Sequence, residues 1–281
     1  VYNGNSMMKH SKMMLLLVCF IAVRAHGQAI DNTLAYKNIN SDSYFRLNYD
    51  NDFFSAKDKY YTQGINAELV TPWLSRFPVS KLLVNPKFDV TRYGLALQHN
   101  GYTPSSIGSD AILYGDRPFA AALMMESFLI ATDTVKKQRF TAKLTAGVVG
   151  PAAGGKQMQT EIHRALNNVM PHGWDNQVSN DLILNYQVGY ERQLVAYRNI
   201  FSLSADAQAR VGTLSDKATL GATMIIGYFD SPFGGKNATA NNFRIYAYDR
   251  PAVNAVAYDA TLQGGMFNNS SPYVIASGDV S

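Results

Sequence analysis

The feature that most constrains this chain is a stretch of about ten residues in which apolar and polar side chains alternate, and which recurs between turn-rich loops. Successive side chains of a β-strand point to opposite faces, so this period predicts strands with two different faces. The segment 44–51 shows the pattern, with Phe45, Leu47 and Tyr49 on one face and Arg46, Asn48 and Asp50 on the other.

The pattern predicts about ten strands and an all-β fold. The composition agrees, because 17 Tyr and 14 Phe residues against 2 Trp are typical of pleated surfaces. The expected strands cover residues 44–51, 62–70, 91–99, 119–131, 140–148, 182–190, 199–211, 218–227, 242–249 and 253–263.

The polar face decides between a soluble β-sandwich and a transmembrane antiparallel β-barrel. In a barrel the polar face lines a watery lumen while the other face meets lipid. The polar positions here carry charges and amides, which favours the barrel; they are Arg46, Asn48, Asp50, Asn66, Glu68, Arg92, Gln98, Lys143, Asn185, Gln187 and Glu191.

The N-terminal segment has the features of a secretory signal peptide. Lys9, His10 and Lys12 precede an apolar run over 13–23, and small residues follow at positions 25 and 27. We therefore expect residues 1–27 to be an overhang with a signal peptide, and residues 28–281 to form one outer-membrane barrel domain. Cys19, the single cysteine, lies in the segment expected to be removed.

Charge and the C-terminal end set further bounds. The net charge is +4, but no Lys/Arg run is long enough to follow a phosphate backbone, so nucleic acid is excluded as a partner.

The chain ends in the turn-like sequence 278–281, where a closing barrel strand usually ends on an aromatic residue. We expect one or two C-terminal strands to be missing here.

One stretch interrupts the strands. Residues 150–155 are rich in glycine and cannot continue a strand, and residues 156–170 predict a short helix with Met158, Ile162, Leu166 and Val169 along one side. Gln159 and His163 are four residues apart and so share a helical face. The simpler interpretation is a histidine that satisfies a polar network at the barrel rim.

Several motifs, in order and spacing, resemble the outer-membrane lipid A 3′-O-deacylase family. They are Asn51-Asp52-Phe53-Phe54, Tyr61-Thr62-Gln63-Gly64, residues 115–119, and the loop 150–155 followed by Gln159, His163 and Trp174. The resemblance implies a barrel of about twelve strands with a short active-site helix. It also implies a Gram-negative outer-membrane hydrolase that removes an ester-linked acyloxyacyl chain from lipid A of lipopolysaccharide, with Ca²⁺.

The resemblance assigns roles that ester hydrolysis requires. His163 would be the general base for water, and Asp52 would provide the carboxylate for calcium. Asn51, Thr62 and Gln159 would complete the catalytic site by oxygen ligation or hydrogen bonding. Taken alone, Asn51-Asp52 is ordinary turn chemistry that ends a strand.

Two departures from the family pattern affect the site. The family carries a lysine in the loop after the third strand, whereas residues 102–114 of this chain contain none. The family also has an acidic residue six positions after the histidine; here Val169 stands at that position, although Asp175 lies nearby. We interpret Asp116 and Arg117 as structural residues at a strand entry.

Two other classes of protein remain as alternatives. A non-enzymatic porin or adhesin would share the strand pattern, and a serine-type outer-membrane phospholipase could use Ser105 or Ser106. In every case we expect lipid around the barrel, lipid A or lipopolysaccharide as the substrate of an enzyme, and a monomer.

Overall fold

The computed structural model describes residues 41–51, 60–234 and 243–276. Their strands form one antiparallel sheet of ten, in the order β1-β2-β3-β4-β5-β6-β7-β8-β10, with β9 also paired to β8. The strands are β1 (Tyr44–Asn51), β2 (Tyr60–Val70), β3 (Val90–Thr103), β4 (Ala120–Asp133), β5 (Gln138–Val149), β6 (Asp181–Tyr197), β7 (Phe201–Gly212), β8 (Ser215–Tyr228), β9 (Ile245–Asp249) and β10 (Ala252–Asp259).

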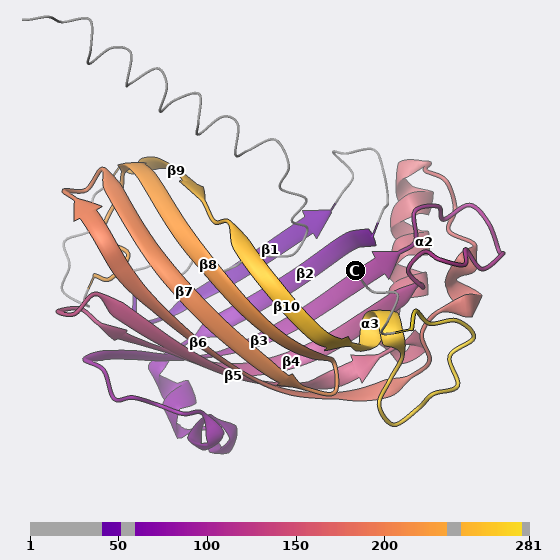
Figure 1. The fold of residues 1–281 in the computed structure, drawn as a ribbon, viewed down its shortest axis with the longest axis horizontal. Helices are drawn as coiled ribbons and strands as arrows, with labels where there is room; N and C mark the ends of the chain where they lie inside the picture. The colour runs from indigo at the N-terminus through magenta and orange to yellow at the C-terminus, as the bar shows by residue number, and fades with distance from the viewer. Residues whose placement is uncertain (1–40, 52–59, 235–242, 277–281) are drawn as a thin grey trace, which may run out of the picture.

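The sheet curls into an open barrel, with β1 and β10 at its two edges (Figure 1). The expected transmembrane barrel architecture, its strands and their two faces are thereby confirmed. Large apolar side chains such as Phe45, Leu47 and Leu97 are exposed on the outer face. None of the helices in the described ranges is long and apolar enough to cross a membrane.

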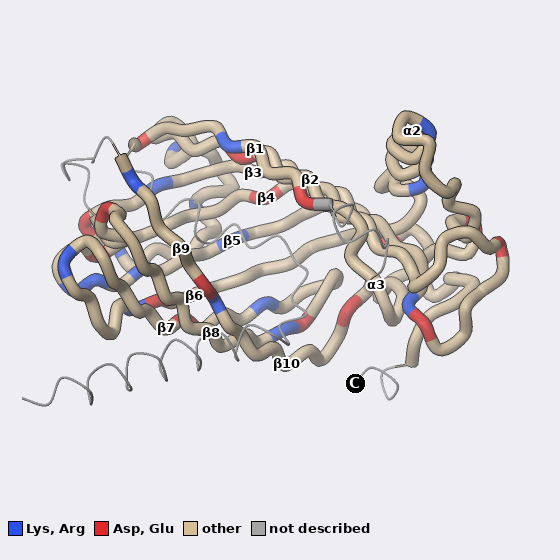
Figure 2. Tube along the Cα trace, turned by 90° about the horizontal axis from the view of Figure 1, so that it is seen from above, with Lys and Arg blue, Asp and Glu red and all other residues tan. Residues whose placement is uncertain are grey.

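Charged side chains on the inner face neutralise one another across neighbouring strands. Figure 2 shows acidic and basic residues at separate positions along the curled sheet, most of whose residues are uncharged. Three cross-strand pairs close at 2.6–2.8 Å, namely Arg46–Glu68, Arg139–Glu191 and Lys143–Glu126. The inner face is therefore polar, and these buried charges are paired with charges of opposite sign, as burial of charge requires.

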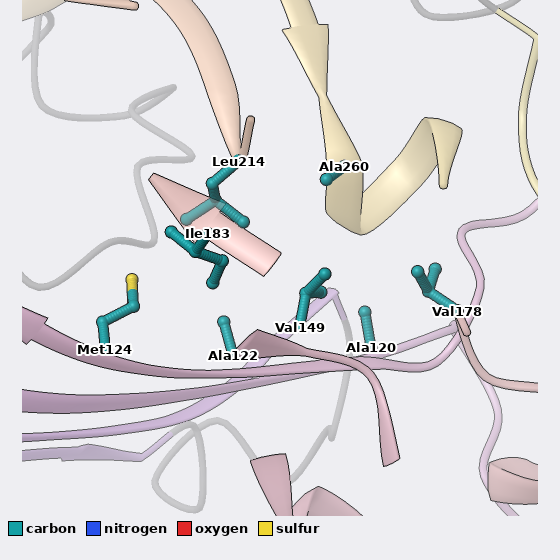
Figure 3. Close-up of a cluster of buried hydrophobic side chains, with 8 residues drawn as sticks. All are labelled: Ala120, Ala122, Met124, Val149, Val178, Ile183, Leu214 and Ala260. Atoms are coloured by element: carbon teal, nitrogen blue, oxygen red, sulfur yellow. The ribbon is translucent and has the colours of Figure 1, made fainter. Parts of the chain in front are cut away.

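A cluster of buried apolar side chains fills one end of the lumen (Figure 3). It joins β4, β5 and β6 to the short helix α3 (Ala260–Gln263). Its members are Ala120, Ala122, Met124, Val149, Val178, Ile183, Leu214 and Ala260. Helix α3 is thus packed against the inner face of the wall at this end.

The connections at the two ends differ in length. At the end that carries α3, the connections 104–119 and 150–180 are long and include η5 (Pro151–Ala153), α2 (Gly155–Leu166) and η6 (Gly173–Asn176). At the opposite end, the turns 134–137 and 198–200 are short. Two connections at this opposite end are longer: 229–244, and 71–89, which contains two 3-10 helices, η3 (Pro72–Arg76) and η4 (Pro78–Leu82). At the α3 end, the turn 213–214 is short.

Several predicted boundaries are wrong. The strands expected over 91–99 and 182–190 are longer and end at Thr103 and Tyr197. The single strand expected over 253–263 ends at Asp259, because its carboxylate accepts a hydrogen bond from the backbone N–H of Thr261 and begins α3. The helix expected over 156–170 ends at Leu166, because Asn167 adopts the left-handed conformation (φ 51°) that terminates helices. The signal peptide, Asp52 and residues 278–281 lie outside the described residues.

Candidate active site

Helix α2 stands at the long-loop end of the barrel, beyond the strands (Figures 1 and 2). Its first residue, Gly155, packs so closely that an added Cβ would lie 2.5 Å from Ala121 Cβ and 2.6 Å from Trp174 Cη2. Ala121 faces away from the lumen cluster that holds its neighbours Ala120 and Ala122, and packs instead with Phe119 and Trp174. The helix therefore begins on the outer, lipid-facing side of the wall.

The polar side of α2 is the buried side. Gln159 is 1% exposed and His163 is 4% exposed, whereas Leu166 and Val169 are exposed. Gln159 and His163 thus share one face as predicted, and that face, not the apolar side, is the packed side of the helix. The physical reason is the solvent: on the outer face of a barrel, lipid takes the place that water has around a soluble protein.

Trp174 fixes the orientation of the Gln159 carboxamide. The indole N–H donates to Gln159 Oε1 at 2.7 Å, and since an indole can only donate, the amide oxygen must face it. The Nε2 group is then directed elsewhere; it is buried and has no acceptor among the described residues. Gln159 consequently presents a hydrogen-bond donor, while its oxygen is already engaged.

The backbone of Val169 orients His163. His163 Nδ1 lies 2.5 Å from the Val169 carbonyl oxygen, which can only accept a hydrogen bond. In the neutral imidazole Nδ1 therefore carries the hydrogen, and Nε2 carries the lone pair. Val169 stands where the family resemblance leads us to expect an acidic residue, and its backbone carbonyl, not a side-chain carboxylate, is the hydrogen-bond partner of the His163 Nδ1–H.

Thr62 lies on β2 at an irregularity of the sheet. The register passes from Tyr61–Tyr102 to Gln63–Gly101, so that Thr62 is the additional residue of a bulge. Its hydroxyl is buried and lies 2.6 Å from the hydroxyl of Thr103 on β3. Asn51, the last residue of β1, pairs in register with Gln63, so β1 ends beside Thr62.

His99 is a residue of this region that the sequence reasoning missed. It is buried on β3, and its Nε2 lies 3.0 Å from the carbonyl oxygen of Ala153, two residues before α2. The strand that carries Thr103 is thereby tied to the loop that carries Gln159 and His163. A signal was present, because the alternation of 91–99 places this histidine at an apolar, outward position.

The nearby charged residues serve other contacts. Asp175 is exposed and pairs with Lys156 at 2.6 Å. Arg117 stacks over the Tyr102 ring at 4.3 Å and donates to Thr261 at 3.1 Å, so it ties α3 to the wall as a structural residue. Burial lowers the pKa of the Arg117 guanidinium, although Tyr102 and Asp259 act to raise it.

The serine alternative finds no support in these contacts. Ser105 and Ser106 are exposed in the connection 104–119, and the backbone N–H of Ser105 donates to Asp116. Within the described residues neither hydroxyl is hydrogen-bonded to a histidine, whereas a serine nucleophile needs a base within that reach.

The described residues do not form a metal cage by themselves. They contain no group of three His, Cys, Asp or Glu side chains that could hold an ion. The described hydroxyl oxygens at this rim include those of Thr62 and Thr103, and Asp52, which follows Asn51, lies outside the described residues. The arrangement as a whole provides a proton acceptor at His163 and a buried donor at Gln159 on the lipid-facing wall.

Comparisons with known proteins agree on one family. A family model described as outer membrane protein LpxR matches residues 14–279. The fold is similar to a solved structure, LpxR from Salmonella typhimurium, with a TM-score of 0.61 and 19% identity over 78% of this chain and 75% of that one. No curated protein sequence matches the chain.

Proposed function

Because the chain belongs to the LpxR family of outer-membrane proteins, we propose that it is a hydrolase that removes an ester-linked acyl chain from lipid A. The observation that carries this proposal is the placement of Gln159 and His163. Both are buried on α2, where they contact Trp174 and the Val169 carbonyl of the connection that follows the helix, and α2 begins on the outward side of the wall rather than in the lumen. A water-soluble solute in a pore would not meet them, whereas a lipid beside the barrel would.

The orientation of the barrel in the membrane supports a lipid of the outer leaflet. Bacterial outer-membrane barrels have short periplasmic turns and longer extracellular loops. The connections 104–119 and 150–180 lie at one end and the short turns 134–137 and 198–200 at the other, so we infer that α2 lies at the extracellular end. Lipopolysaccharide occupies that leaflet, and its lipid A portion carries the ester bonds at this depth.

The residues can divide the hydrolysis between them. The lone pair of His163 Nε2 takes a proton from water, and the oxygen of that water attacks the ester carbonyl carbon. Gln159 Nε2–H donates to the carbonyl oxygen as negative charge develops on it. When the carbon–oxygen bond to the alcohol breaks, protonated His163 returns its proton to the leaving oxygen. The products are a fatty acid and a lipid A with a free hydroxyl.

We also propose that Ca²⁺ assists, held by oxygen donors at the end of β1. Asp52 directly follows Asn51, whose register places it beside Thr62, and carboxylate, amide and hydroxyl oxygens are what a hard cation prefers. Gln159 is not among these ligands, since its oxygen accepts from Trp174. When bound, the ion would polarise the ester carbonyl.

The test is incubation of the purified barrel with hexa-acylated lipid A in mixed micelles, followed by mass spectrometry of both products. We expect lipid A to lose the mass of one ester-linked acyl group and the corresponding fatty acid to appear. A porin or adhesin would release no acyl chain.

Chelation separates the metal proposal from the hydrolase proposal. Excess chelator should abolish acyl release, added calcium should restore it, and the heat-dependent gel mobility of the barrel should stay unchanged. Asp52→Asn should reproduce the loss, whereas Asp110→Asn, at an exposed acid of the loop 104–119, should not. Full activity in chelator would refute calcium while leaving the hydrolase intact.

A further inference from the structure

The connection 71–89 lies on the barrel in a way that the hydrolase does not explain. Its two 3-10 turns, η3 and η4, lie below the sheet at the end opposite α2 (Figure 1). Leu83 packs against Leu129, Ala131 and Ala142, which belong to the outer faces of β4 and β5. The segment thus folds back over the lipid-facing wall instead of extending away from it.

Hydrogen bonds from the wall hold this segment in place. The Tyr186 hydroxyl of β6 accepts from the backbone N–H of Val84 at 2.9 Å and donates to the Leu82 carbonyl at 3.1 Å. Inside the segment, the buried Ser80 hydroxyl donates to the Leu74 carbonyl at 2.8 Å. Leu74 itself is buried. The exposed side chains of the segment are therefore held by a fixed backbone.

The outward side of the segment is both apolar and cationic. Trp73 is 59% exposed and Leu82 is 64% exposed, with Phe77 exposed beside Trp73 at a ring distance of 5.6 Å. Arg76 and Lys81 are exposed on the same two turns, and no Asp or Glu occurs from residue 71 to 88. A tryptophan, other apolar groups and unopposed cations are what an element lying in a membrane interface carries.

We propose that residues 72–84 form an interfacial anchor that inserts Trp73, Phe77 and Leu82 among phospholipids of the periplasmic leaflet, while Arg76 and Lys81 bind their anionic headgroups. The short turns 134–137 and 198–200 mark this end as periplasmic. Continuity with the lipid-facing wall places the segment at the edge of the bilayer. The charge argues for anionic lipid, since basic residues near a membrane surface are attracted to negatively charged headgroups.

Two tryptophans make the proposal directly testable. The chain contains only Trp73 and Trp174, and Trp174 is 1% exposed at the other end. The difference in emission between the parent and Trp73→Phe therefore isolates Trp73. We would reconstitute both into phosphatidylethanolamine vesicles with and without phosphatidylglycerol, containing phospholipid brominated near the top of its acyl chains.

We expect the brominated lipid to quench most of the Trp73 emission and aqueous acrylamide to quench little of it. With Arg76→Gln and Lys81→Gln combined, the quenching should no longer depend on phosphatidylglycerol. The matched control changes Lys136→Gln and Arg198→Gln, two exposed cations of the short turns at the same end. If acrylamide quenches the Trp73 emission and brominated lipid does not, Trp73 does not lie in the membrane and the anchor proposal is overturned. This holds whether the segment then faces water or a periplasmic protein. Unchanged lipid dependence in the Arg76/Lys81 variant would overturn the headgroup contact.

Discussion

His163→Ala removes the group that would take the proton from water. General base catalysis typically contributes about 10²- to 10⁴-fold, so we expect acyl release to fall by that factor while the barrel still shows its heat-dependent mobility. Initial rates of acyl release, measured by mass spectrometry, give that factor. Glu161→Ala, at an exposed position of the same helix, is the control and should leave the rate unchanged.

A different outcome would identify His163 as a rim residue. If His163→Ala kept the parent rate and lost only about 1 kcal/mol of stability, as one buried hydrogen bond typically contributes, the role of His163 would be structural, as in its contact with Val169.

Gln159→Glu is a sharper change than Gln159→Ala, because a carboxylate still accepts from the Trp174 indole but has no N–H to donate. Both variants should lose about 10²- to 10³-fold in rate, the usual effect of one oxyanion donor. Gln157→Ala, an exposed glutamine on the same helix, should behave as the parent. Equal rates for Gln159→Glu and the parent would exclude Gln159 as a donor.

At the scale of elements, the close approach of α2 to the wall depends on Gly155. In Gly155→Ala the new methyl group would meet Ala121 and Trp174 below 3 Å, so the helix must move outward or tilt. We expect acyl release to fall at least tenfold without loss of the folded barrel, because misplacement of catalytic groups by an ångström can cost about 10² in rate. In Gly108→Ala, the added Cβ would lie 3.6 Å from its nearest neighbour, Val169, and the rate should not change. A fully active Gly155→Ala would show that this contact does not position the site.

The elements differ in how far the sequence predicts them. Strand positions follow from alternation, because lipid outside and paired charges inside leave each strand few other registers. The side of the wall on which α2 lies does not follow, since a helix with one polar and one apolar side suits lumen and exterior alike. The contact of His99 could not be predicted for a related reason. Its partner, Ala153, is 54 residues away in sequence, so the alternation of β3 shows that His99 faces outward but not what it contacts.

At the scale of the whole molecule, the outer face must be the lipid face. Leu97 is exposed near the middle of β3, and its neighbour Gln98 points to the other side and bonds to Asn100. Leu97→Arg should destabilise the barrel in vesicles by about 2–4 kcal/mol, whereas Gln98→Arg should change little, because only the first buries a charge in lipid. Urea unfolding followed by tyrosine fluorescence and gel mobility gives both values. Equal losses for the two variants would contradict this assignment of the faces.

The burial of the polar side of α2, with its apolar side exposed, bears on when the proposed hydrolase would become active. Before a newly exported chain enters the bilayer, water surrounds the exterior of the barrel, and exposed Leu166 and Val169 have no apolar medium to favour their position. We expect α2 to dock late in biogenesis, so that a chain in transit through the periplasm cannot cut the lipids it passes. Protease cleavage after exposed Lys156 and Arg164 reports this timing: it should be rapid in the exported intermediate and slow after insertion, and rapid cleavage in both states would contradict late docking.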